Sequence, residues 1–122
     1  MAKDLEKFIV FSLNQKAYAL SIFDTYQIFA YQHLNPVPQT NKFIAGLTYQ
    51  DGHIVTVLHT AKILGISEKS LPKQAILLRE DSHYYAYLVD EVLDVVELGE
   101  IKKRKLKILQ LKEILTSINL HE

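Results

Sequence analysis

The residues best able to do chemistry in this sequence are its five histidines. Two of them, His53 and His59, lie six positions apart on one expected strand. A strand rises about 3.3 Å per residue, so these side chains would be roughly 20 Å apart. Ligands of one metal ion must all lie within a few ångströms of it, and the sequence has no His-x-His or His-x-x-x-His pair. We therefore expect histidines that face solvent or pack against neighbours, and no metal site.

A group of carboxylates, Asp90, Glu91 and Asp94, is the next candidate for chemistry. General acid–base catalysis needs two such groups in a cleft with separated pKa values, and closeness in sequence supplies neither condition. A solvated surface or the first turn of a helix is the simpler interpretation. The chain has no cysteine nucleophile, no Gly-x-Ser-x-Gly sequence, and only four glycines, which form no phosphate-binding loop. We expect no catalytic residues, no cofactor and no enzyme activity.

One run of like charge remains, because five of the six residues between Lys102 and Lys107 are basic. Such a run suits nucleic-acid phosphates or an acidic protein surface. It also suits a solvated hairpin loop followed by an edge strand, where lysine discourages pairing with other chains. The tyrosines and phenylalanines that would stack on bases lie elsewhere in the sequence. A small β-barrel that binds nucleic acid through residues 102–107 is therefore an alternative function, and we expect no nucleic acid as a partner.

The bulk composition is that of one soluble globular domain. The chain has 122 residues, a formal net charge of zero and a hydrophobic fraction of 48%. The apolar stretch near the N-terminus is short and broken by Ser12, unlike a signal peptide. No run approaches the roughly 18 apolar residues of a membrane helix. We expect a cytoplasmic protein that is not inserted in a membrane.

The elements that would position a site are mostly strands. One hairpin is predicted from Phe8–Leu13 and Ala17–Ile22, and a second from Phe43–Leu47 and His53–Leu58, which Asp51-Gly52 closes with a tight turn. Residues 23–30 suit either a helical turn or a strand, and we assign a short helix there. The expected helices are Phe23–Tyr31, Thr60–Leu64 and Lys112–Ile118. The expected core is Phe8, Val10, Tyr18, Leu20, Ile44, Ile54, Val57, Leu58, Ile76, Leu78, Tyr85, Val89, Val92, Leu106, Ile108 and Leu111.

The second half of the chain repeats the pattern of the first. A shift of 67 positions places Phe8 on Ala75, and a shift of 51 places Val57 on Ile108. The second repeat is shorter, because it lacks the proline-containing loop and the counterpart of strand Phe43–Leu47. The sequence therefore predicts a single domain, 1–122, of two small antiparallel β units. The first repeat spans about residues 7–66 and the second, abbreviated one about 74–115.

The order of the motifs resembles the CheW family of bacterial chemotaxis coupling proteins. The resemblance rests on Phe43-Ile44-Ala45-Gly46-Leu47, on Gly52-x-Ile54-Val55-x-Val57-Leu58, and on the segment Tyr85–Val92. It implies an all-β fold of two SH3-like β-barrel subdomains with short helices. It also implies a non-enzymatic adaptor that couples a methyl-accepting chemoreceptor to a CheA-type histidine kinase, in chemotaxis or related motility signalling.

The resemblance also implies which residues contact partners. The eight candidates are Phe43, Ile44, Gly46, Leu47, Tyr49, Asp51, Val89 and Asp90. Where the family has Asn-Leu-Arg, this chain has Tyr49-Gln50-Asp51, so a positive charge becomes negative. That change either alters partner choice or reflects only that Asp-Gly makes a good turn. The missing strand leaves an edge that residues 112–122 or a second chain can cover, and the second chain would make a homodimer.

Overall fold

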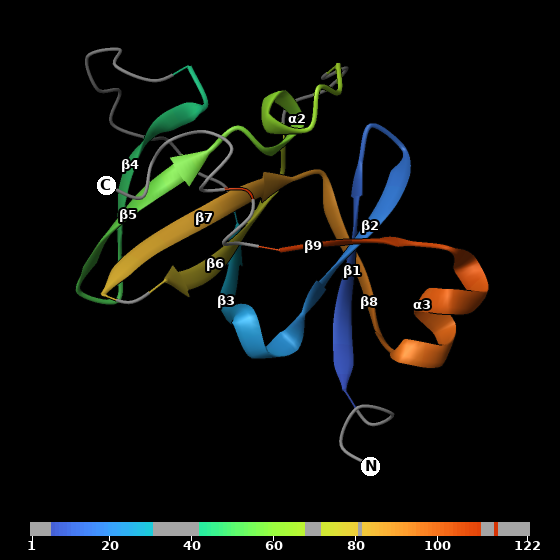
Figure 1. The fold of residues 1–122 in the computed structure, drawn as a ribbon. Helices are drawn as coiled ribbons and strands as arrows, with labels where there is room; N and C mark the ends of the chain where they lie inside the picture. The colour runs from blue at the N-terminus through green and yellow to red at the C-terminus, as the bar shows by residue number, and fades with distance from the viewer. Residues whose placement is uncertain (1–5, 31–41, 68–71, 81, 111–113, 115–122) are drawn as a thin grey trace.

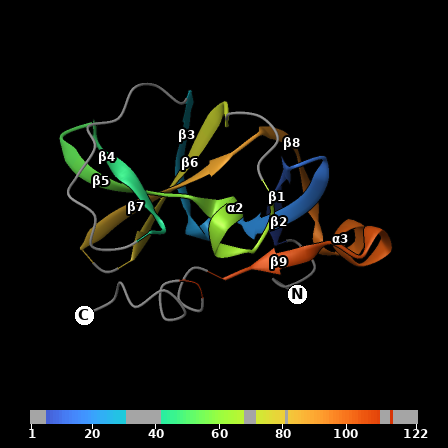
Figure 2. The same ribbon diagram turned by 90° about the horizontal axis from the view of Figure 1, so that it is seen from above.

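The computed structural model describes residues 6–30, 42–67, 72–80, 82–110 and 114. Within them nine strands form two sheets that lie side by side (Figures 1 and 2). Sheet A has the order β8 (Glu91–Glu97), β1 (Lys7–Leu13), β2 (Lys16–Ser21) and β9 (Lys107–Leu109). Sheet B has the order β3 (Thr25–Ala30), β6 (Gln74–Glu80), β7 (His83–Val89), β5 (His53–Leu58) and β4 (Ile44–Gln50). The helical segments are η1 (Ile22–Asp24), α2 (Thr60–Ile63) and α3 (Leu98–Arg104).

Three apolar clusters form the core, and one of them joins the two sheets. The largest lies between them and joins residues of β1 and β2, such as Phe11 and Leu20, to residues of β6 and β7, such as Tyr87. A second lies on the other face of sheet B, and a third lies between sheet A and α3. Because β1 is buried on both faces, its sequence is a nearly continuous apolar run rather than an alternating one. The all-β fold class is confirmed.

The expectation of purely antiparallel pairing is wrong at two places. Strand β5 runs parallel to β7, and β9 runs parallel to β2. Neighbouring strands in the chain were assumed to pair with each other, which gives antiparallel hairpins. Here β5 pairs with β7 in addition to its neighbour β4, and β9 pairs with β2. Both parallel partners are far away in sequence, so their direction depends on tertiary packing.

The internal repeat is visible in the strand register. Phe8 pairs with Val96 in sheet A, and the residues that correspond to them after a shift of 67 positions, Ala75 and Phe29, pair in sheet B. Both pairings carry a bulge at the corresponding place. The shift of 51 positions also holds, because Val57 pairs with Ala86 and Ile108 pairs with Ala19. Corresponding strands therefore pair in the same way in the two sheets.

Neither sheet is built from one repeat alone. Sheet A combines the β1–β2 hairpin with β8 and β9, whereas sheet B combines the β6–β7 hairpin with β3, β4 and β5. Each half of the chain thus lends strands to the sheet of the other half. Strand β4 has no counterpart in sheet A among the described residues, as expected from the shorter second repeat.

The predicted helix Phe23–Tyr31 is wrong. Ser21 does cap a helical start, since its Oγ accepts a hydrogen bond from the Phe23 N–H at 3.2 Å, but the turn ends at Asp24. Strand β3 follows and pairs with β6, which its β-branched and aromatic residues suit. Tyr31 lies outside the described residues. The helix at Thr60–Leu64 is confirmed as α2, and most of Lys112–Ile118 lies outside the described residues.

The basic run is not a hairpin loop, because its first three residues belong to α3. Ile101 packs this helix against sheet A, and Lys105 ends it in a left-handed conformation (φ 54°). The Leu106 N–H then donates to the Ile101 carbonyl at 3.1 Å. Basic residues in the last turn of a helix stabilise it, because they interact with the negative end of the helix dipole. The run therefore stabilises a helix that the charge pattern alone did not indicate.

Most of the predicted core is buried, with one clear error. Ile54 is 67% exposed, because it lies at the turn end of β5, outside the cluster between the sheets that buries Leu58 on the same face of the strand. The residues predicted as core that are only half-buried are Ile44, Val92, Leu106 and Ile108, and Leu111 lies outside the described residues. The predicted core residues that are confirmed as buried are Phe8, Val10, Tyr18, Leu20, Val57, Leu58, Ile76, Leu78, Tyr85 and Val89.

Candidate partner-binding hairpin

The β4–β5 hairpin ends in the two-residue turn that the sequence predicts. Gln50 pairs with His53 across it, and both central residues have positive φ, 50° at Asp51 and 83° at Gly52. Two positive φ values define the turn type whose twist matches that of the flanking strands. The turn holds the Asp51 carboxylate, which is exposed, at the tip of sheet B.

Two large apolar side chains lie beside this turn. Tyr49 and Ile54 pair across the strands, and they are 70% and 67% exposed. They border a hollow of about 500 Å³ on sheet B, which is lined by Tyr49, Gly52, His53, Ile54, Thr56, Ser82, His83 and Tyr84. An exposed aromatic–aliphatic pair beside a hollow is the surface that a protein partner can bury.

Stacked side chains support the hollow from β5, β6 and β7. The rings of His53 and Tyr84 are 4.0 Å apart between centroids and 13° from parallel. The Arg79 guanidinium carbon lies 5.9 Å from the centroid of the same tyrosine ring. Aromatic stacking and a cation over a ring each restrict side-chain motion. The side chains of His53, Tyr84 and Arg79 therefore stabilise one another next to Tyr49 and Ile54.

Four predicted contact residues, all near the start of β4, support the hairpin instead of forming its tip. The Phe43 carbonyl accepts a hydrogen bond from the His59 N–H at 2.8 Å, and Lys42 Nζ lies 5.3 Å from the centroid of the Phe43 ring. Phe43 and Ile44 are half-buried and pack against the cluster between the sheets. Gly46 is buried and Leu47 is half-buried. Phe43, Ile44 and Leu47 therefore expose only part of their side chains to a possible partner.

Val89 and Asp90 are separate from the tip of the hairpin. Val89 is 0% exposed, so its side chain is part of the core. The Asp90 carboxylate accepts a hydrogen bond from the Asn14 N–H at 2.7 Å, and the Asp90 N–H donates to the Ser12 carbonyl at 2.9 Å. These bonds fasten the β1–β2 turn to the end of β7. The structure therefore shows Asp90 as a link between the two sheets.

Sequence reasoning missed three residues of this surface. The apolar pattern places Ile54 in the core, the spacing of the histidines indicates no role for His53, and no pattern connects Tyr84 to the hairpin. Tyr84 reaches His53 only because β5 and β7 pair in parallel, with Val55 opposite Tyr84. The aromatic composition of residues 83–87 was the available signal, although it did not indicate a partner strand.

Gly52 gives a direct test of the turn. Gly52→Ala is expected to lower the free energy of unfolding by about 1 kcal/mol, because alanine disfavours positive φ and no atom lies within 4 Å to add a clash. Gly99→Ala is the matched control, since it is also open but lies in α3. There alanine should raise the free energy of unfolding, by about 0.5–1 kcal/mol. Urea unfolding measures both, and equal changes would contradict the assigned turn.

Other classes of site find no support in the described part of the chain. It contains no group of three or more metal-ligating side chains that could hold an ion. None of its helices is long and apolar enough to span a membrane.

Comparison with known proteins decides the family. Residues 7–117, nearly the whole chain, match the CheW-like domain. The chain belongs to the CheW-like family. Its alignment with the chemotaxis protein CheW of Thermotoga maritima has 31% identity over 103 residues, which cover 82% of this chain and 68% of that protein. With CheW of Bacillus subtilis the identity is 29% over 97 residues, or 78% of this chain and 62% of the relative.

A solved CheW structure shares the fold of this CheW-like chain. The crystal structure of the scaffolding protein TtCheW from Thermoanaerobacter tengcongensis superposes with a TM-score of 0.70 at 29% identity. The match covers 75% of this chain and 64% of TtCheW. The matched part of the CheW-like chain thus covers about two thirds of the length of these relatives.

Proposed function

We propose that this CheW-like protein is a non-enzymatic cytoplasmic scaffold that couples a chemoreceptor to a CheA-type histidine kinase in chemotaxis or motility signalling. Its relatives are named chemotaxis proteins, and the solved relative is named a scaffolding protein. The observation that carries the proposal is the exposed Tyr49–Ile54 pair on a rigid hairpin, because it offers a partner apolar area without an enzyme site.

The binding surface combines an apolar anchor with a charge. Tyr49 and Ile54 lose water when a partner covers them, and aromatic anchors of this kind carry much of the energy of protein interfaces. Asp51 sets the sign of charge that the partner must present at the turn. A partner surface with a carboxylate there is repelled, and one with lysine or arginine is attracted. We therefore propose that Asp51 favours partners other than those whose surface is complementary to the family's arginine at this position.

The alternative function, nucleic-acid binding through residues 102–107, has weaker support. Arg104 Nε contacts a Glu100 carboxylate oxygen at 3.2 Å, and Arg104 Nη2 contacts an Asp94 carboxylate oxygen at 3.4 Å. The arginine best suited to hold a phosphate is thus already paired with two carboxylates.

Asp51→Arg tests the proposed specificity. We expect this variant to bind the kinase and receptor of its own organism at least tenfold more weakly, and to bind a receptor–kinase pair with surfaces complementary to the family's arginine more tightly. Asp51→Asn is the matched control, because Asn-Gly also makes this turn and only the charge is lost. Calorimetric titration measures all three proteins. Affinities that stay within about 0.5 kcal/mol for both pairs would show that Asp51 acts only in the turn.

A further inference from the structure

The outer edge of β9 is the feature of sheet A that the proposed function leaves unused. In sheet B the corresponding strand, β5, lies between β7 and β4. In sheet A, β9 pairs with β2 on one side, and no strand lies on its other side within the described ranges. The correspondence between β5 and β9 continues past the strands. The His59 carbonyl accepts a hydrogen bond from the Ile63 N–H at 3.1 Å, and 51 positions later the Gln110 carbonyl accepts one from the Ile114 N–H at 3.1 Å.

The repeat also indicates which backbone groups face this edge. Gln50 and His53 close a two-residue hairpin, so their backbones exchange hydrogen bonds. The backbone N–H and C=O groups of every second residue of β5, counted from His53, therefore point toward β4. The His59 N–H, which donates to the Phe43 carbonyl at 2.8 Å, continues this alternation. A shift of 51 positions places Val57 on Ile108 and His59 on Gln110. The N–H groups of Ile108 and Gln110 therefore point to the open edge.

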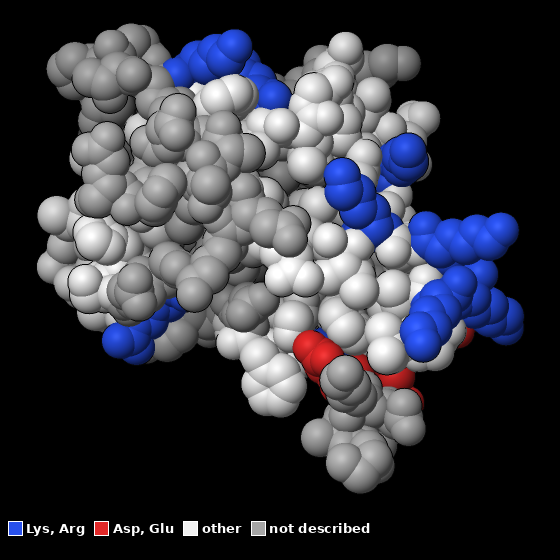
Figure 3. All heavy atoms as spheres, viewed as in Figure 1, with Lys and Arg blue, Asp and Glu red and all other residues white. Residues whose placement is uncertain are grey.

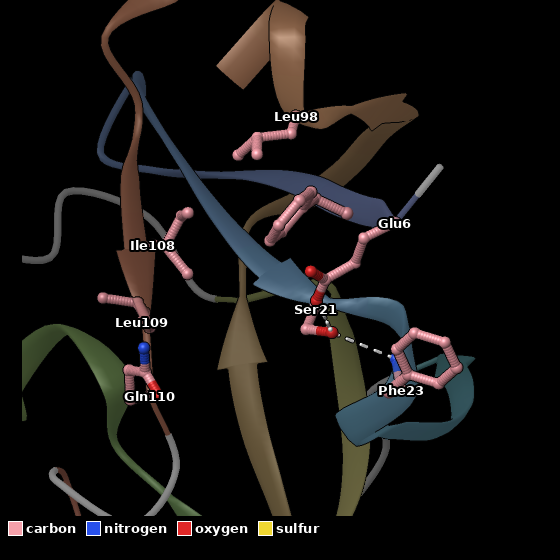
Figure 4. A pocket seen from close by; sticks show the side chains of 8 residues that line it. Glu6, Ser21, Phe23, Leu98, Ile108, Leu109 and Gln110 are labelled. Atoms are coloured by element: carbon pink, nitrogen blue, oxygen red, sulfur yellow. Dashed lines mark hydrogen bonds between the residues drawn. The ribbon is translucent and has the colours of Figure 1, made fainter. Parts of the chain in front are cut away.

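Two hollows border β9, one on each face of sheet A, beside the position that an added strand would take. The hollow on the α3 side has a volume of about 470 Å³, and Figure 4 shows Leu98, Ile108 and the 83% exposed Phe23 around it. The hollow on the α2 side has a volume of about 290 Å³ and is bordered by Ile63, Leu64 and Ile114 among others. Both offer apolar surface to alternate side chains of an extended segment.

The positive charge beside this edge favours a bound segment that carries negative charge. Lys102, Lys103, Lys105 and Lys107 are all exposed. Figure 3 shows basic side chains gathered over α3, next to the start of β9. A strand that runs antiparallel to β9, as β4 runs to β5, would end beside Lys105 and Lys107. Carboxylates at the C-terminal end of that strand would meet these lysines.

We propose that the β9 edge binds an extended segment of another protein by strand addition. The segment lies antiparallel to β9, places apolar side chains in the two hollows, and carries Asp or Glu at its C-terminal end. A second copy of this chain fits less well. Two antiparallel β9 strands of three residues would bring their Lys107 side chains together on one face, where like charges repel. The edge is distinct from the Tyr49–Ile54 surface.

A peptide probe tests this proposal on the full-length chain. The probe has the sequence of residues 43–51, FIAGLTYQD, which covers the equivalent edge in sheet B and ends in a carboxylate. A second peptide, FIAGLTYQK, differs only in its last residue, whose side chain is positively instead of negatively charged. We expect the acidic peptide to bind more tightly, and the amide NMR signals of Ile108 and Gln110 to shift and become protected from hydrogen exchange.

Charge reversal on the protein completes the test. Lys107→Glu should weaken binding of the acidic peptide about three- to tenfold and strengthen that of the basic peptide. Lys16→Glu, an equal change at the exposed β1–β2 turn, should alter neither affinity. Equal binding of the two peptides, or amide shifts at another edge, would overturn the proposal. Amide protection at Ile108 in the free protein would also overturn it: concentration-dependent protection would identify a second copy, and constant protection the chain's own residues.

Discussion

Phe11→Ala is expected to lower the free energy of unfolding by about 3–5 kcal/mol, the usual cost of removing a buried phenylalanine side chain. Phe11 is 0% exposed in the cluster between the sheets. Its ring stacks on Tyr18 with centroids 6.1 Å apart. The loss has two parts, because the apolar side chain no longer leaves water on folding and the rigid neighbours leave a cavity. A domain of this size has a total stability of only about 5–15 kcal/mol, so much of it would be lost.

The control for this variant is the same substitution on the surface. Phe23 is 83% exposed, so Phe23→Ala should change the free energy of unfolding by no more than about 0.5 kcal/mol. Urea unfolding with one transition and unchanged denaturant dependence would allow a direct comparison. Similar losses for the two variants would show that the cluster between the sheets does not hold the fold together.

Asp90→Ala is expected to lower the free energy of unfolding by about 1.5–3 kcal/mol, the range for hydrogen bonds that involve a charged group. The variant leaves the Asn14 N–H without the carboxylate that accepts from it at 2.7 Å. Asn14 has a φ of 52°, so the same bond also holds a turn that costs conformational energy. The loss should loosen the β1–β2 turn from the end of β7.

Asp94→Ala is the control for Asp90→Ala. Asp94 is also an acidic residue, but it lies within β8 and contacts Arg104 at 3.4 Å on the exposed surface. Pairs of this kind contribute about 1 kcal/mol or less. If Asp90→Ala keeps the free energy of unfolding within 0.5 kcal/mol of the parent and weakens kinase or receptor binding, Asp90 is a contact residue, as the family resemblance implied.

The exchange of strands between the repeats has a consequence for the proposed scaffold. Sheet A contains strands from both ends of the chain, and sheet B contains strands from its middle. Unfolding of one sheet therefore releases strands that are covalently joined to the other. We expect the two sheets to unfold together. In the folded protein the Tyr49–Ile54 surface and the β9 edge would then keep a constant position relative to each other.

The sequence by itself determined the local elements of this protein. The apolar runs of β1 and β6, the turn at Asp51-Gly52 and the two repeat shifts all follow from patterns within short segments. These features depend on backbone preference and on side-chain alternation, which act between residues close in the chain. The family motifs also follow from such patterns, and the family was therefore named correctly.

Only the tertiary structure decided which strands pair and which side chains reach the surface. Residues 25–30 form a strand because β6 supplies backbone partners, although Ser21 caps a helical turn immediately before them. Tyr84 joins the candidate site because β5 pairs with β7 as well as with its hairpin neighbour, and Ile54 is exposed because the cluster that buries Leu58 does not extend to the turn end of β5. Alternation assigns a side chain to one of two faces, but whether a face is covered depends on segments distant in sequence, and local patterns contain no information about them.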